Sequence, residues 1–519
     1  SVLYDVPVDT ILHVKNENLQ VYSENPLRQI PVPRNFSVSS IQPTVFTHRG
    51  SGLVDFNRDR LLPMMYSNET PSLIKGDVNG DGVEEFYIGG GKDQAGRFVQ
   101  FEKGRFTSNV SKEMEEVKLG EDTRGTLVDV DSDGDLDLYM AKGGRFFPKT
   151  SEAMIDQLFL NDGNGNFSKS RHTLPIGPIS TSIVLPIDYD KDNDQDLFIG
   201  ERFDPFTYGL GGRAYLLQND GQGVFKDVTG IHASALQNIG MVTDAVATDI
   251  DNDEWMDLVI VGDWMPVVVL KNNASAFSDA SASFGLENTT GWWHDIEQAD
   301  LNKDGKPDFV IGNHGLNTFF KQGDRMYLAD FDRNGSVEQV FCTRVLEKDY
   351  PIADKDEFLS QLPGMKKQLL YYSDYGKKSI EELFPAETLA GAKALEVKIL
   401  ASVLLLSGRS GYQIVQMPQE AQYSPIYALS VSDFDNDGIQ DVIAGGNQYL
   451  VKPQFGRYDA SHGWFFKGML DSDNFSLASG TTLNVDGQIR DIAFTVINGT
   501  KYILFAKYDD DLEICSIPD

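Results

Sequence analysis

The sequence predicts an all-β protein, a seven-bladed β-propeller with a small helical insertion, and it leaves a count of eight blades open. Nine-residue acidic loops start at residues 77, 129, 188, 249, 300, 330 and 433, and four of the six intervals between successive starts lie between 51 and 61 residues. Each loop is preceded by one apolar stretch and followed by another. A repeat of this length with several short strands is typical of propellers and related arrays.

Each repeat contains recognisable strands. GTLVDV, TSIVLPI and VTDAVAT precede acidic loops, and DLYMAKGG, DLFIGER and DLVIVGD follow them. A third strand ends at Asn161-Asp162-Gly163 in one repeat and at Asn219-Asp220-Gly221 in another, residues that accept the positive φ of a tight hairpin. The last copy, from Arg490 onward, has only an Asn-Gly turn in place of the loop. The strand framework therefore does not need the aspartates, and the acidic loops need a cause of their own.

Residues 314–401 break the rhythm, and we predict that they form an insertion within one blade. The pattern becomes helical at 351–395, where Phe358, Leu359 and Leu362 share one face and Ser379 with Glu382 has the spacing of a capping box. The insertion would contain the off-period loop at 330, leaving seven blades, the last near residue 495. If the repeat at 330 is a blade of its own, the count becomes eight.

The net charge of −33, from 45 basic and 78 acidic residues, limits the expected partners. Nucleic acids and anionic membrane surfaces are bound through cationic patches, so neither is expected here. Cations are the natural counterpart of this chain. No stretch is apolar for long enough to span a bilayer, and Cys342 and Cys515 are expected to be buried thiols.

The acidic loops have the ligand pattern of a hard divalent cation. Counting nine positions from the first aspartate, side-chain oxygens stand at positions 1, 3, 5 and 9, and position 7 offers a main-chain carbonyl. Calcium takes six to eight oxygen ligands, whereas magnesium keeps more water. Turn chemistry alone explains one such loop, but seven in one register would suffer repulsion without a cation. We expect about five to seven calcium ions.

The predicted metal-binding residues are the five odd-numbered positions of each loop. They are Asp77, Asn79, Asp81, Val83 and Glu85; Asp129, Asp131, Asp133, Asp135 and Asp137; Asp188, Asp190, Asp192, Asp194 and Asp196; Asp249, Asp251, Asp253, Trp255 and Asp257; Asp300, Asn302, Asp304, Lys306 and Asp308; Asp330, Asp332, Asn334, Ser336 and Glu338; and Asp433, Asp435, Asp437, Ile439 and Asp441.

Position 6 of the loop, where the chain turns sharply, separates stronger from weaker candidates. It is glycine in five loops and Asn193 in a sixth, but it is Glu254 in the loop at 249. Glutamate is a poor choice for a left-handed conformation, so we expect this loop to be distorted or empty. The loop at 330 is also a weaker candidate, because it has Asn334 at position 5 and Glu338 at position 9.

The repeat resembles the FG-GAP or VCBS repeat of integrin α-chain propellers: an apolar strand, DxDxDGxxD, a strand with Ile-Gly, then LxNDGxGxF. From about Val45, the stretches FTHRGSGLVDFNRDRLLPMMYSNETPSLIKGDVNGDG, GDWMPVVVLKN and GWWHDIEQADLNKDGKPDFVIGNHGLN resemble the C-terminal half of bacterial ASPIC/UnbV-type surface proteins. This resemblance implies a tail of a preceding ASPIC-type β domain, or an N-terminal extension, at 1–35 and the propeller at 36–519. It also implies calcium-stabilised blades and an extracellular or outer-membrane-associated location.

Aromatic and polar residues gather where the second strand of a blade is expected to end. Aromatic platforms beside amide groups suit a glycan or peptide ligand. The alternative is that Trp264 and Trp292 simply pack between blades. The candidate ligand-binding residues are Arg145, Arg202, Trp264, Trp292, Trp293, His294, His314, Asn317, Asn447 and Tyr449.

We find no HExxH, GxSxG or phosphate-binding motif, and therefore expect a non-enzymatic protein. The expected function is recognition, adhesion or assembly at the cell surface, with a protein or glycan ligand. The resemblance also implies a link to outer-membrane nutrient transporters. Two alternatives stay open: a carbohydrate-active enzyme such as a calcium-dependent polysaccharide lyase, and a purely structural subunit of a surface complex that docks through the helical insertion.

Overall fold

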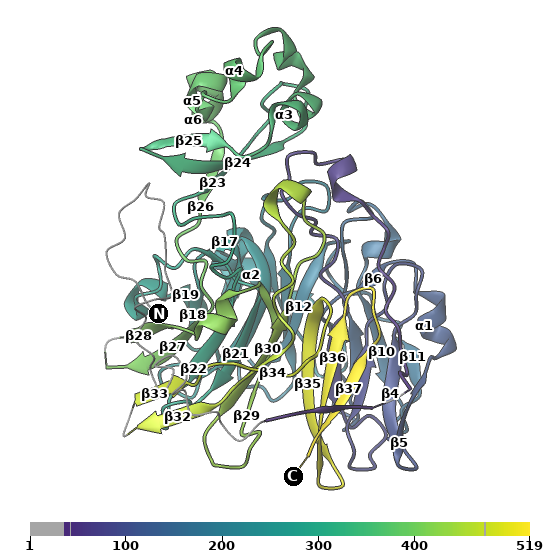
Figure 1. Ribbon diagram of the computed structural model, residues 1–519. Helices are drawn as coiled ribbons and strands as arrows, with labels where there is room; N and C mark the ends of the chain where they lie inside the picture. Colours follow the sequence, from purple (N-terminus) through teal and green to yellow (C-terminus); the bar gives the residue numbers. More distant parts are fainter. Residues whose placement is uncertain (1–35, 42, 410, 472–473, 519) are drawn as a thin grey trace, which may run out of the picture. The chain divides into compact units, whose positions relative to one another are not determined.

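The computed structural model describes residues 36–41, 43–409, 411–471 and 474–518. The chain divides into two units, Ser1–Phe36 and Ser37–Asp519, and the following description concerns the second. The ASPIC-type tail predicted at 1–35 lies outside the described residues. The second unit consists mostly of antiparallel sheets with a few short helices (Figure 1). The prediction of an all-β, propeller-like protein is therefore confirmed.

Four-stranded antiparallel sheets follow one another along the chain, and the first four are each formed by strands close together in sequence. The first four sheets comprise β2 (Leu73–Gly76), β3 (Glu85–Ile88), β4 (Arg97–Glu102) and β5 (Arg105–Asn109); β7 (Thr126–Val128), β8 (Asp137–Met140), β10 (Gln157–Asn161) and β11 (Phe167–Lys169); β12 (Thr181–Ile187), β13 (Asp196–Glu201), β14 (Ala214–Gln218) and β15 (Lys226–Asp227); and β16 (Met241–Thr248), β17 (Asp257–Met265), β18 (Val268–Asn272) and β19 (Phe277–Asp279), with β20 (Gly291–Trp292) added to β17.

Three more sheets follow the same plan, and the last of them includes the N-terminal strand of this unit. Ser40 of that strand pairs with Cys515. These sheets comprise β21 (Asp295–Ala299), β22 (Asp308–Gly312), β27 (Val403–Gly408) and β28 (Gly411–Gln416); β29 (Ile426–Ser432), β30 (Asp441–Gly446), β31 (Trp464–Phe466) and β34 (Thr481–Thr482); and β35 (Ile489–Ile497), β36 (Thr500–Lys507), β37 (Glu513–Ile517) and β1 (Ser39–Ser40).

The first strands of successive sheets contact one another in the order β2, β7, β12, β16, β21, β29 and β35, and β35 in turn contacts β2. Aspartates near the starts of three first strands connect neighbouring sheets by accepting a backbone N–H from the next one. The bonds are Leu73 N to Asp491 Oδ2 (2.8 Å), Ile296 N to Asp244 Oδ2 (3.1 Å) and Leu429 N to Asp295 Oδ2 (2.6 Å).

Apolar clusters fill the spaces between adjacent sheets. The second strands β8, β17, β22 and β30 are buried along their whole length, because neighbouring sheets cover both of their faces. One cluster joins the first sheet to the last, with Phe86 and Val99 packed together with Leu504 and Ile514. The acidic loops therefore project from an apolar framework.

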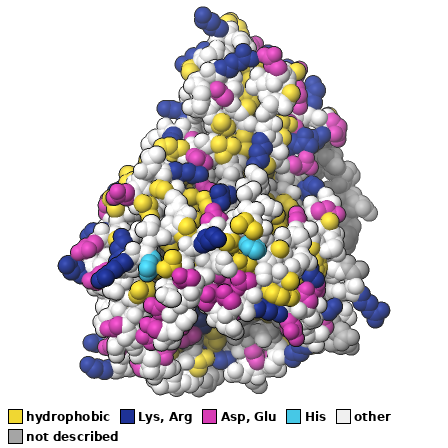
Figure 2. All heavy atoms as spheres, turned by 180° about the vertical axis from the view of Figure 1, so that it is seen from behind, with side chains coloured by type: hydrophobic (Ala, Val, Ile, Leu, Met, Phe, Trp, Pro, Cys, Tyr) yellow, Lys and Arg dark blue, Asp and Glu magenta, His cyan; other side chains and the backbone are white. Residues whose placement is uncertain are grey.

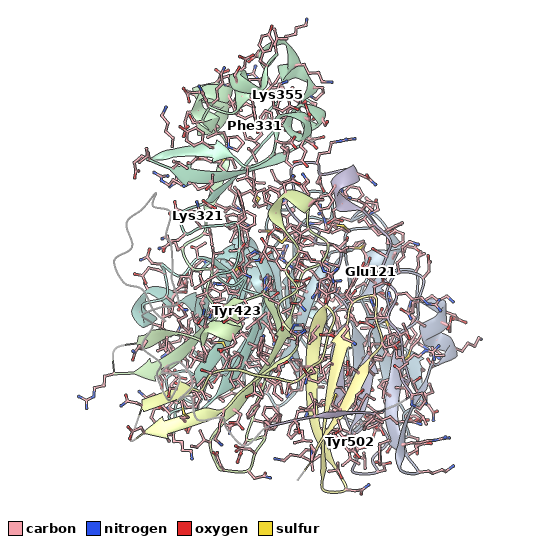
Figure 3. The ribbon with its side chains drawn as sticks, viewed as in Figure 1. Glu121, Lys321, Phe331, Lys355, Tyr423 and Tyr502 are labelled. Atoms are coloured by element: carbon pink, nitrogen blue, oxygen red, sulfur yellow. The ribbon has the colours of Figure 1, made fainter. Side chains whose placement is uncertain are left out.

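The fifth sheet is interrupted, since residues 313–402 separate its paired strands β22 and β27. They form a further sheet, in the order β25-β24-β23-β26, with helices packed on it (Figure 1). Phe331 and Lys355 lie in this insertion (Figure 3). Of the capping box predicted at Ser379 and Glu382, the Glu382 side chain accepts the Ser379 backbone N–H at 3.0 Å, whereas Ser379 Oγ makes no hydrogen bond with the described residues. The elements are β23 (Arg325–Ala329), β24 (Glu338–Val345), β25 (Lys348–Pro351), β26 (Lys393–Glu396), α3 (Lys355–Gln361), α4 (Tyr372–Tyr375), α5 (Ile380–Leu383) and α6 (Ala386–Ala390).

Residues 55–71, which we call the strap, contact several sheets without joining any of them. Tyr66 stacks on Tyr208 with ring centroids 3.7 Å apart. Asp55 pairs with Arg145, and Glu69 pairs with Arg202. The strap is therefore held by buried polar contacts as well as by apolar packing.

The remaining described elements are short. They are β6 (Glu121–Asp122), β9 (Lys142–Gly143), β32 (Gly468–Asp471), β33 (Asn474–Leu477), α1 (Lys112–Glu116) and α2 (Thr229–His232), with 3-10 turns η2 (Asp55–Asn57), η3 (Glu152–Met154), η4 (Ser234–Asn238), η5 (Ser281–Phe284), η6 (Pro363–Lys367), η7 (Gln419–Gln422) and η8 (Pro453–Phe455).

Two further sequence predictions can be compared with this part of the chain. Within the described ranges, none of the helices has the length and apolar character needed to cross a membrane. Cys342 and Cys515 are both buried free thiols, as predicted.

Candidate metal centres and central cavity

The acidic loops occupy equivalent places in their sheets. Six of them join the first strand of a sheet to the second, and the loop at 330 joins β23 to β24 in the insertion. In the last sheet the same connection is the turn formed by Asn498 and Gly499, both with positive φ, as the sequence predicts. A face with a dense group of Asp and Glu side chains near its centre is visible in Figure 2.

Position 9 is the structural anchor of every loop. Its carboxylate accepts the backbone N–H of position 2, which closes the loop onto the start of the second strand. These N-to-oxygen bonds run from Val78 to Glu85 (3.1 Å), Val130 to Asp137 (3.1 Å), Tyr189 to Asp196 (3.3 Å), Ile250 to Asp257 (3.1 Å), Leu301 to Asp308 (2.9 Å), Phe331 to Glu338 (3.0 Å) and Phe434 to Asp441 (3.1 Å).

In five loops the other oxygen of position 9 accepts an N–H from the third strand or from one of the two residues after it, so one buried carboxylate links three parts of the structure. The donors are the backbone N–H groups of Asn161 (2.8 Å), Asn219 (2.8 Å), Asn272 (2.7 Å), Ser407 (2.6 Å) and Gly468 (2.8 Å). The sequence pattern assigns position 9 only to the metal, whereas the structure gives it a second, structural role.

The backbone of each loop turns through the left-handed region at positions 4 and 6. The left-handed conformation at position 6 was predicted for glycine and asparagine, but Glu254 adopts it as well, with φ 68°. Its N–H reaches Asp249 Oδ2 at 2.7 Å, as the N–H of Gly134 reaches Asp129 Oδ2 at 3.0 Å. The expected distortion of the loop at 249 is therefore not observed, because the hydrogen bonds of the turn hold a residue in a conformation that is unfavourable for it.

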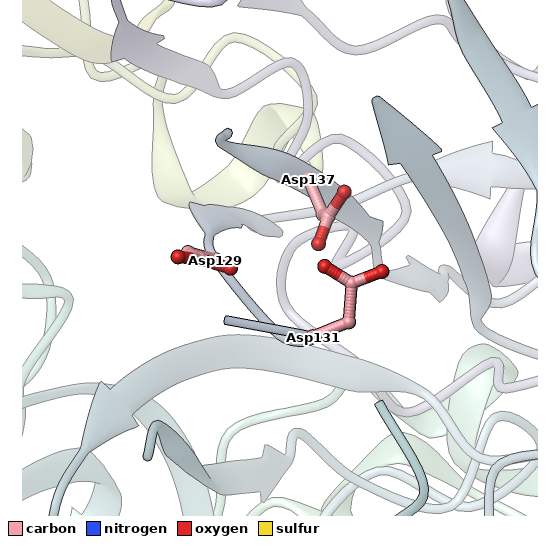
Figure 4. Close-up of side chains that lie close together, drawn as sticks. All are labelled: Asp129, Asp131 and Asp137. Carbon is pink, nitrogen blue, oxygen red and sulfur yellow. The ribbon is translucent and has the colours of Figure 1, made fainter. Parts of the chain in front are cut away.

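Five loops bring the carboxylates of positions 1, 3 and 9 together, with one oxygen of each within 4.8 Å of the others. Figure 4 shows the group formed by Asp129, Asp131 and Asp137, with the carboxylates of Asp131 and Asp137 turned toward each other. The groups are Asp129, Asp131 and Asp137; Asp188, Asp190 and Asp196; Asp249, Asp251 and Asp257; Asp330, Asp332 and Glu338; and Asp433, Asp435 and Asp441.

Several oxygens in these groups are buried without a hydrogen-bond donor. Within the described residues, Oδ1 of Asp129, Asp131, Asp188, Asp190 and Asp332 has no partner. Burial, and then the neighbouring charges of Asp133 and Asp129, raise the pKa of Asp131, and burial raises the pKa of Asp196 to about 8. Oxygens that lack donors and repel each other fit a hard divalent cation, which would supply the missing positive charge.

The loops at 77 and 300 differ because position 3 is asparagine. Asn79 Nδ2 donates to Glu85 Oε1 at 2.8 Å, and Asn302 Nδ2 donates to Ser407 Oγ at 3.3 Å. An amide in place of a carboxylate removes one negative charge. With one negative charge fewer, these two loops are weaker candidates for calcium binding than the loops at 129 and 188.

In the loops at 249 and 433, a lysine of the same sheet lies against the carboxylates. Lys271 pairs with Asp251 and with Asp253 (3.2 Å), and Lys467 pairs with Asp435 and with Asp437 (2.6 Å). Each lysine directly precedes the residue whose backbone N–H donates to position 9. The residue at this place is Leu160 in the second sheet and Gln218 in the third. The ammonium group already neutralises part of the charge that a cation would neutralise, so calcium must compete with it.

We expect Lys467→Met to make this loop more dependent on calcium. Without calcium the variant should melt at a lower temperature than the wild type, because Asp435 and Asp437 lose their counter-charge. With calcium, affinity at this loop should rise about fivefold, since an ion pair at a partly exposed site contributes about 1 kcal/mol. Calorimetric titration measures both effects, with Lys393→Met on β26 as the control. Unchanged affinity in Lys467→Met would show that the lysine does not compete.

A cavity of about 80 Å³ lies between the strap and the starts of the first strands. Glu69 of the strap accepts two hydrogen bonds from Arg202, whose Nη2 also donates to Asp263 at 2.6 Å. Tyr427 stacks on His294, with ring centroids 4.1 Å apart, and the Arg490 guanidinium lies 4.3 Å from the Tyr427 ring centroid. The cavity is thus lined by charged and aromatic groups from the strap and several sheets.

Of the predicted ligand-binding residues, Arg202 and His294 line this cavity. Trp264, Trp292 and Trp293 are buried and form no exposed aromatic platform. Trp264 and Trp292, for which the alternative was packing between blades, pack in an apolar cluster with residues of the strap and the insertion, whereas Trp293 packs between the fourth and fifth sheets. The other predicted residues lie away from the cavity. Arg145 is buried against Asp55 and Asp59, His314 is buried against Trp292, and Asn447 is buried and hydrogen-bonded to Ser424. Asn317 donates to Tyr423 O, and Arg457 covers the Tyr449 ring.

The sequence pattern does not identify Glu69, Tyr427 or Arg490 as site residues, although all three line the cavity. The sequence contains one pattern that indicates part of the cavity. Asp244, Asp295 and Asp491 recur near the start of a first strand, in TDA, HDI and RDI. Aligning the repeats on these aspartates would have placed the neighbouring His294 and Arg490 at the same level of the sheets.

Comparison with known proteins identifies the repeat. The FG-GAP-like repeat matches residues 129–199 and 249–311. None of the curated proteins matches the sequence. Similar solved structures include Sqt1 of Saccharomyces cerevisiae (11% identity, 89% of this chain and 100% of that chain, TM-score 0.41) and the Vibrio cholerae biofilm matrix protein Bap1 (11%, 93% and 92%, TM-score 0.34). The chain therefore contains FG-GAP-like repeats, as predicted, and the ASPIC/UnbV resemblance stays a prediction.

Proposed function

We propose that this chain is a calcium-stabilised extracellular β-propeller that acts as a recognition, adhesion or assembly module at the cell surface. Its ring would comprise seven blades, closed where the last sheet meets the first. Four observations support this closure: the contact between β35 and β2, the bond from Leu73 N to Asp491, the shared apolar cluster and the pairing of β1 with β37. Closure would leave no edge strand exposed at the seam.

The observation that carries the calcium part of the proposal is the set of buried, unpartnered carboxylate oxygens in the loops at 129, 188 and 330. A cation bound only by the folded protein stabilises each site by about 1.4 kcal/mol at ten times its Kd. Loops with this degree of solvent exposure suit the millimolar calcium concentrations outside cells, where extracellular modules bind with Kd values of about 10⁻⁴–10⁻³ M. Calcium would thus act as a structural cation.

The recognition role is tested with the purified chain, fluorescently labelled, on a glycan array and on intact bacterial cells. We expect calcium-dependent binding to a subset of glycans or to a surface protein, without release of cleaved sugar. The matched control is the same chain in EDTA. Turnover of a polysaccharide would instead favour the alternative of a carbohydrate-active enzyme. Absence of binding to cells and to the array would contradict the proposal.

A second candidate function, a structural subunit that docks through the insertion, is favoured by one specific observation. Leu370 and Tyr371, beside α4, have 67% and 70% of their surface exposed, and Tyr372 next to them is exposed as well. Neighbouring large apolar side chains on a surface are typical of protein contact sites.

We expect Leu370→Ser combined with Tyr371→Ser to abolish co-purification with a partner from the native membrane fraction, because the apolar contact area is lost. Melting temperature should stay unchanged. Leu346→Ser is the matched control, since Leu346 is also highly exposed but lies in the turn between β24 and β25. Equal co-purification by the double variant and the wild type would exclude docking through this surface.

A further inference from the structure

We infer that the cavity beneath the strap binds a carboxylate group, so that the ligand of this module is a molecule that carries one. The inference rests on the proposed recognition function and adds the chemistry of its ligand. The relevant groups are Arg490, Arg202, His294 and Ser67, all of which line the cavity. They come from the strap and from three different sheets.

Arg490 is a buried cation without an anionic partner. Only 4% of its surface is exposed, and its hydrogen bonds go to neutral acceptors: Asn68 O at 2.5 Å, Asn447 O and Ile489 O at 3.0 Å each, and Gln488 Oε1 at 3.3 Å. Along the described parts of the chain, no carboxylate oxygen lies within 4.0 Å of this guanidinium. Burial lowers the pKa of Arg490, and the negative charge of Glu69 acts in the opposite direction.

Other polar groups of the cavity also lack partners. Within the described residues, Arg202 Nη1, His294 Nε2 and Ser67 Oγ are buried and make no hydrogen bond. Arg202 and Ser67 are almost completely buried, and the His294 side chain is 6% exposed. Glu121 Oε1, in the same cavity, has no partner among the described residues either. Buried polar groups without partners are rare in native proteins and point to a missing ligand or to water.

The acidic groups nearby limit the charge that a ligand of this cavity can carry. Glu69 and Asp263 both pair with Arg202, and their second negative charge balances Arg490 at longer range. Glu121 also lines the cavity (Figure 3), but burial raises its pKa to about 8, so this carboxyl group is largely protonated at neutral pH. A monoanion adds one negative charge to groups that otherwise cancel, whereas a dianion such as phosphate adds two and is repelled more strongly by Glu69 and Asp263.

Water is the alternative occupant. A cavity of about 80 Å³ accommodates on the order of five water molecules. Water satisfies donors but needs acceptors of its own, whereas a carboxylate only accepts hydrogen bonds. Within the described part of the chain, Arg202 Nη1 makes no hydrogen bond, and Arg490 Nη2 makes one, to Gln488 Oε1 at 3.3 Å, so both nitrogens have N–H groups to donate. The Tyr427 ring centroid lies 4.3 Å from Arg490 Cζ and restricts the position of this guanidinium. These free donors favour a carboxylate over water.

A neighbouring arginine shows the contrast. Arg124 lines the same cavity and a second one of about 560 Å³, but it pairs with both Asp244 and Asp295. Its charge is fully compensated, so it provides no site for an anion. The Glu69 side chain, 27% exposed, shows that solvent reaches the cavity beside Arg202.

The experiment is a calorimetric titration of the full chain in calcium with sodium acetate at constant ionic strength. Acetamide, which has the same size and no charge, is the matched probe. We expect saturable binding of acetate and none of acetamide. Arg490→Gln should weaken acetate binding about tenfold or more. Arg325→Gln, in the insertion and paired with Glu396, should leave it unchanged. Binding of neither probe to the wild type, or unaltered acetate binding by Arg490→Gln, would overturn the inference.

Arg490→Gln also loosens the strap, so a second measurement is needed if this variant does not fold. Diffraction from wild-type crystals soaked in acetate, compared with crystals soaked in acetamide, should then show a carboxylate in the cavity beside Arg490, and a cavity that holds only water in both would contradict the inference. Galacturonate compared with galactose, and a free peptide C-terminus compared with its amide, distinguish the sources of the carboxylate. Acetate binding without any ligand on cells or arrays would reject the proposed function alone. Array binding without acetate binding would reject only the inference.

Discussion

Asp137→Ala is expected to lose about 3 kcal/mol or more of the free energy of unfolding, with or without calcium. The Asp137 carboxylate is completely buried and accepts the N–H groups of Val130 (3.1 Å) and Asn161 (2.8 Å). Alanine leaves both donors buried without an acceptor, and each unsatisfied group costs about 1–3 kcal/mol. Denaturant unfolding in EDTA and in calcium measures the loss.

The matched control is Asp131→Asn in the same loop. Asp131 Oδ1 has no hydrogen-bond donor, and repulsion contributes to its raised pKa. In EDTA this variant should be at least as stable as the wild type, because one negative charge is removed. In calcium it should be less stable than the wild type, because a neutral amide oxygen replaces a charged ligand. If Asp137→Ala destabilised the protein only in calcium, position 9 would be a metal ligand without the structural role given to it here.

Arg145→Met is expected to cost about 3–5 kcal/mol, because it leaves carboxylates in the interior without their counter-ion. Arg145 and Asp55 are fully buried, and their Nη1–Oδ2 distance is 2.9 Å. Asp59 pairs with the other terminal nitrogen of the same guanidinium. Since both aspartates belong to the strap, the variant should also release it. Calorimetric melting and limited proteolysis within residues 55–71 measure the two effects.

Arg333→Met provides the comparison for Arg145. Arg333 pairs with Glu387 at 2.7 Å, but both side chains are largely exposed, so its loss should leave the melting temperature almost unchanged. If Arg145→Met were equally stable and impaired only ligand binding, the sequence-based assignment of Arg145 to a ligand site would be right and its role as a buried anchor wrong.

Much of the loop architecture could be predicted because it repeats locally. The register of DVDSDGDLD sets its turn, and the alternation of apolar strand, loop and apolar strand sets each hairpin. The helical pattern and the capping box at Ser379 and Glu382 were also local signals. Such features depend on residues within about ten positions of one another, which a single sequence displays directly.

The central cavity could not be predicted in the same way. Arg202 and Arg490 are far apart in the chain, and only the stacking of sheets brings them to one cavity. The buried tryptophans show the same limit, because the local sequence around a Trp that follows a strand does not differ between a Trp covered by other parts of the structure and an exposed one. Lys271 and Lys467 also lie outside the loops they neutralise, so a motif restricted to nine residues misses them.

The central claim, that the acidic loops hold calcium, is tested most directly by elemental analysis of the purified chain together with its melting temperature before and after chelation. We predict several calcium ions per chain, and a fall of about 4 °C in EDTA that is reversed by calcium and not by magnesium. A chain that contains no calcium, and whose melting temperature is the same in EDTA, would contradict the claim.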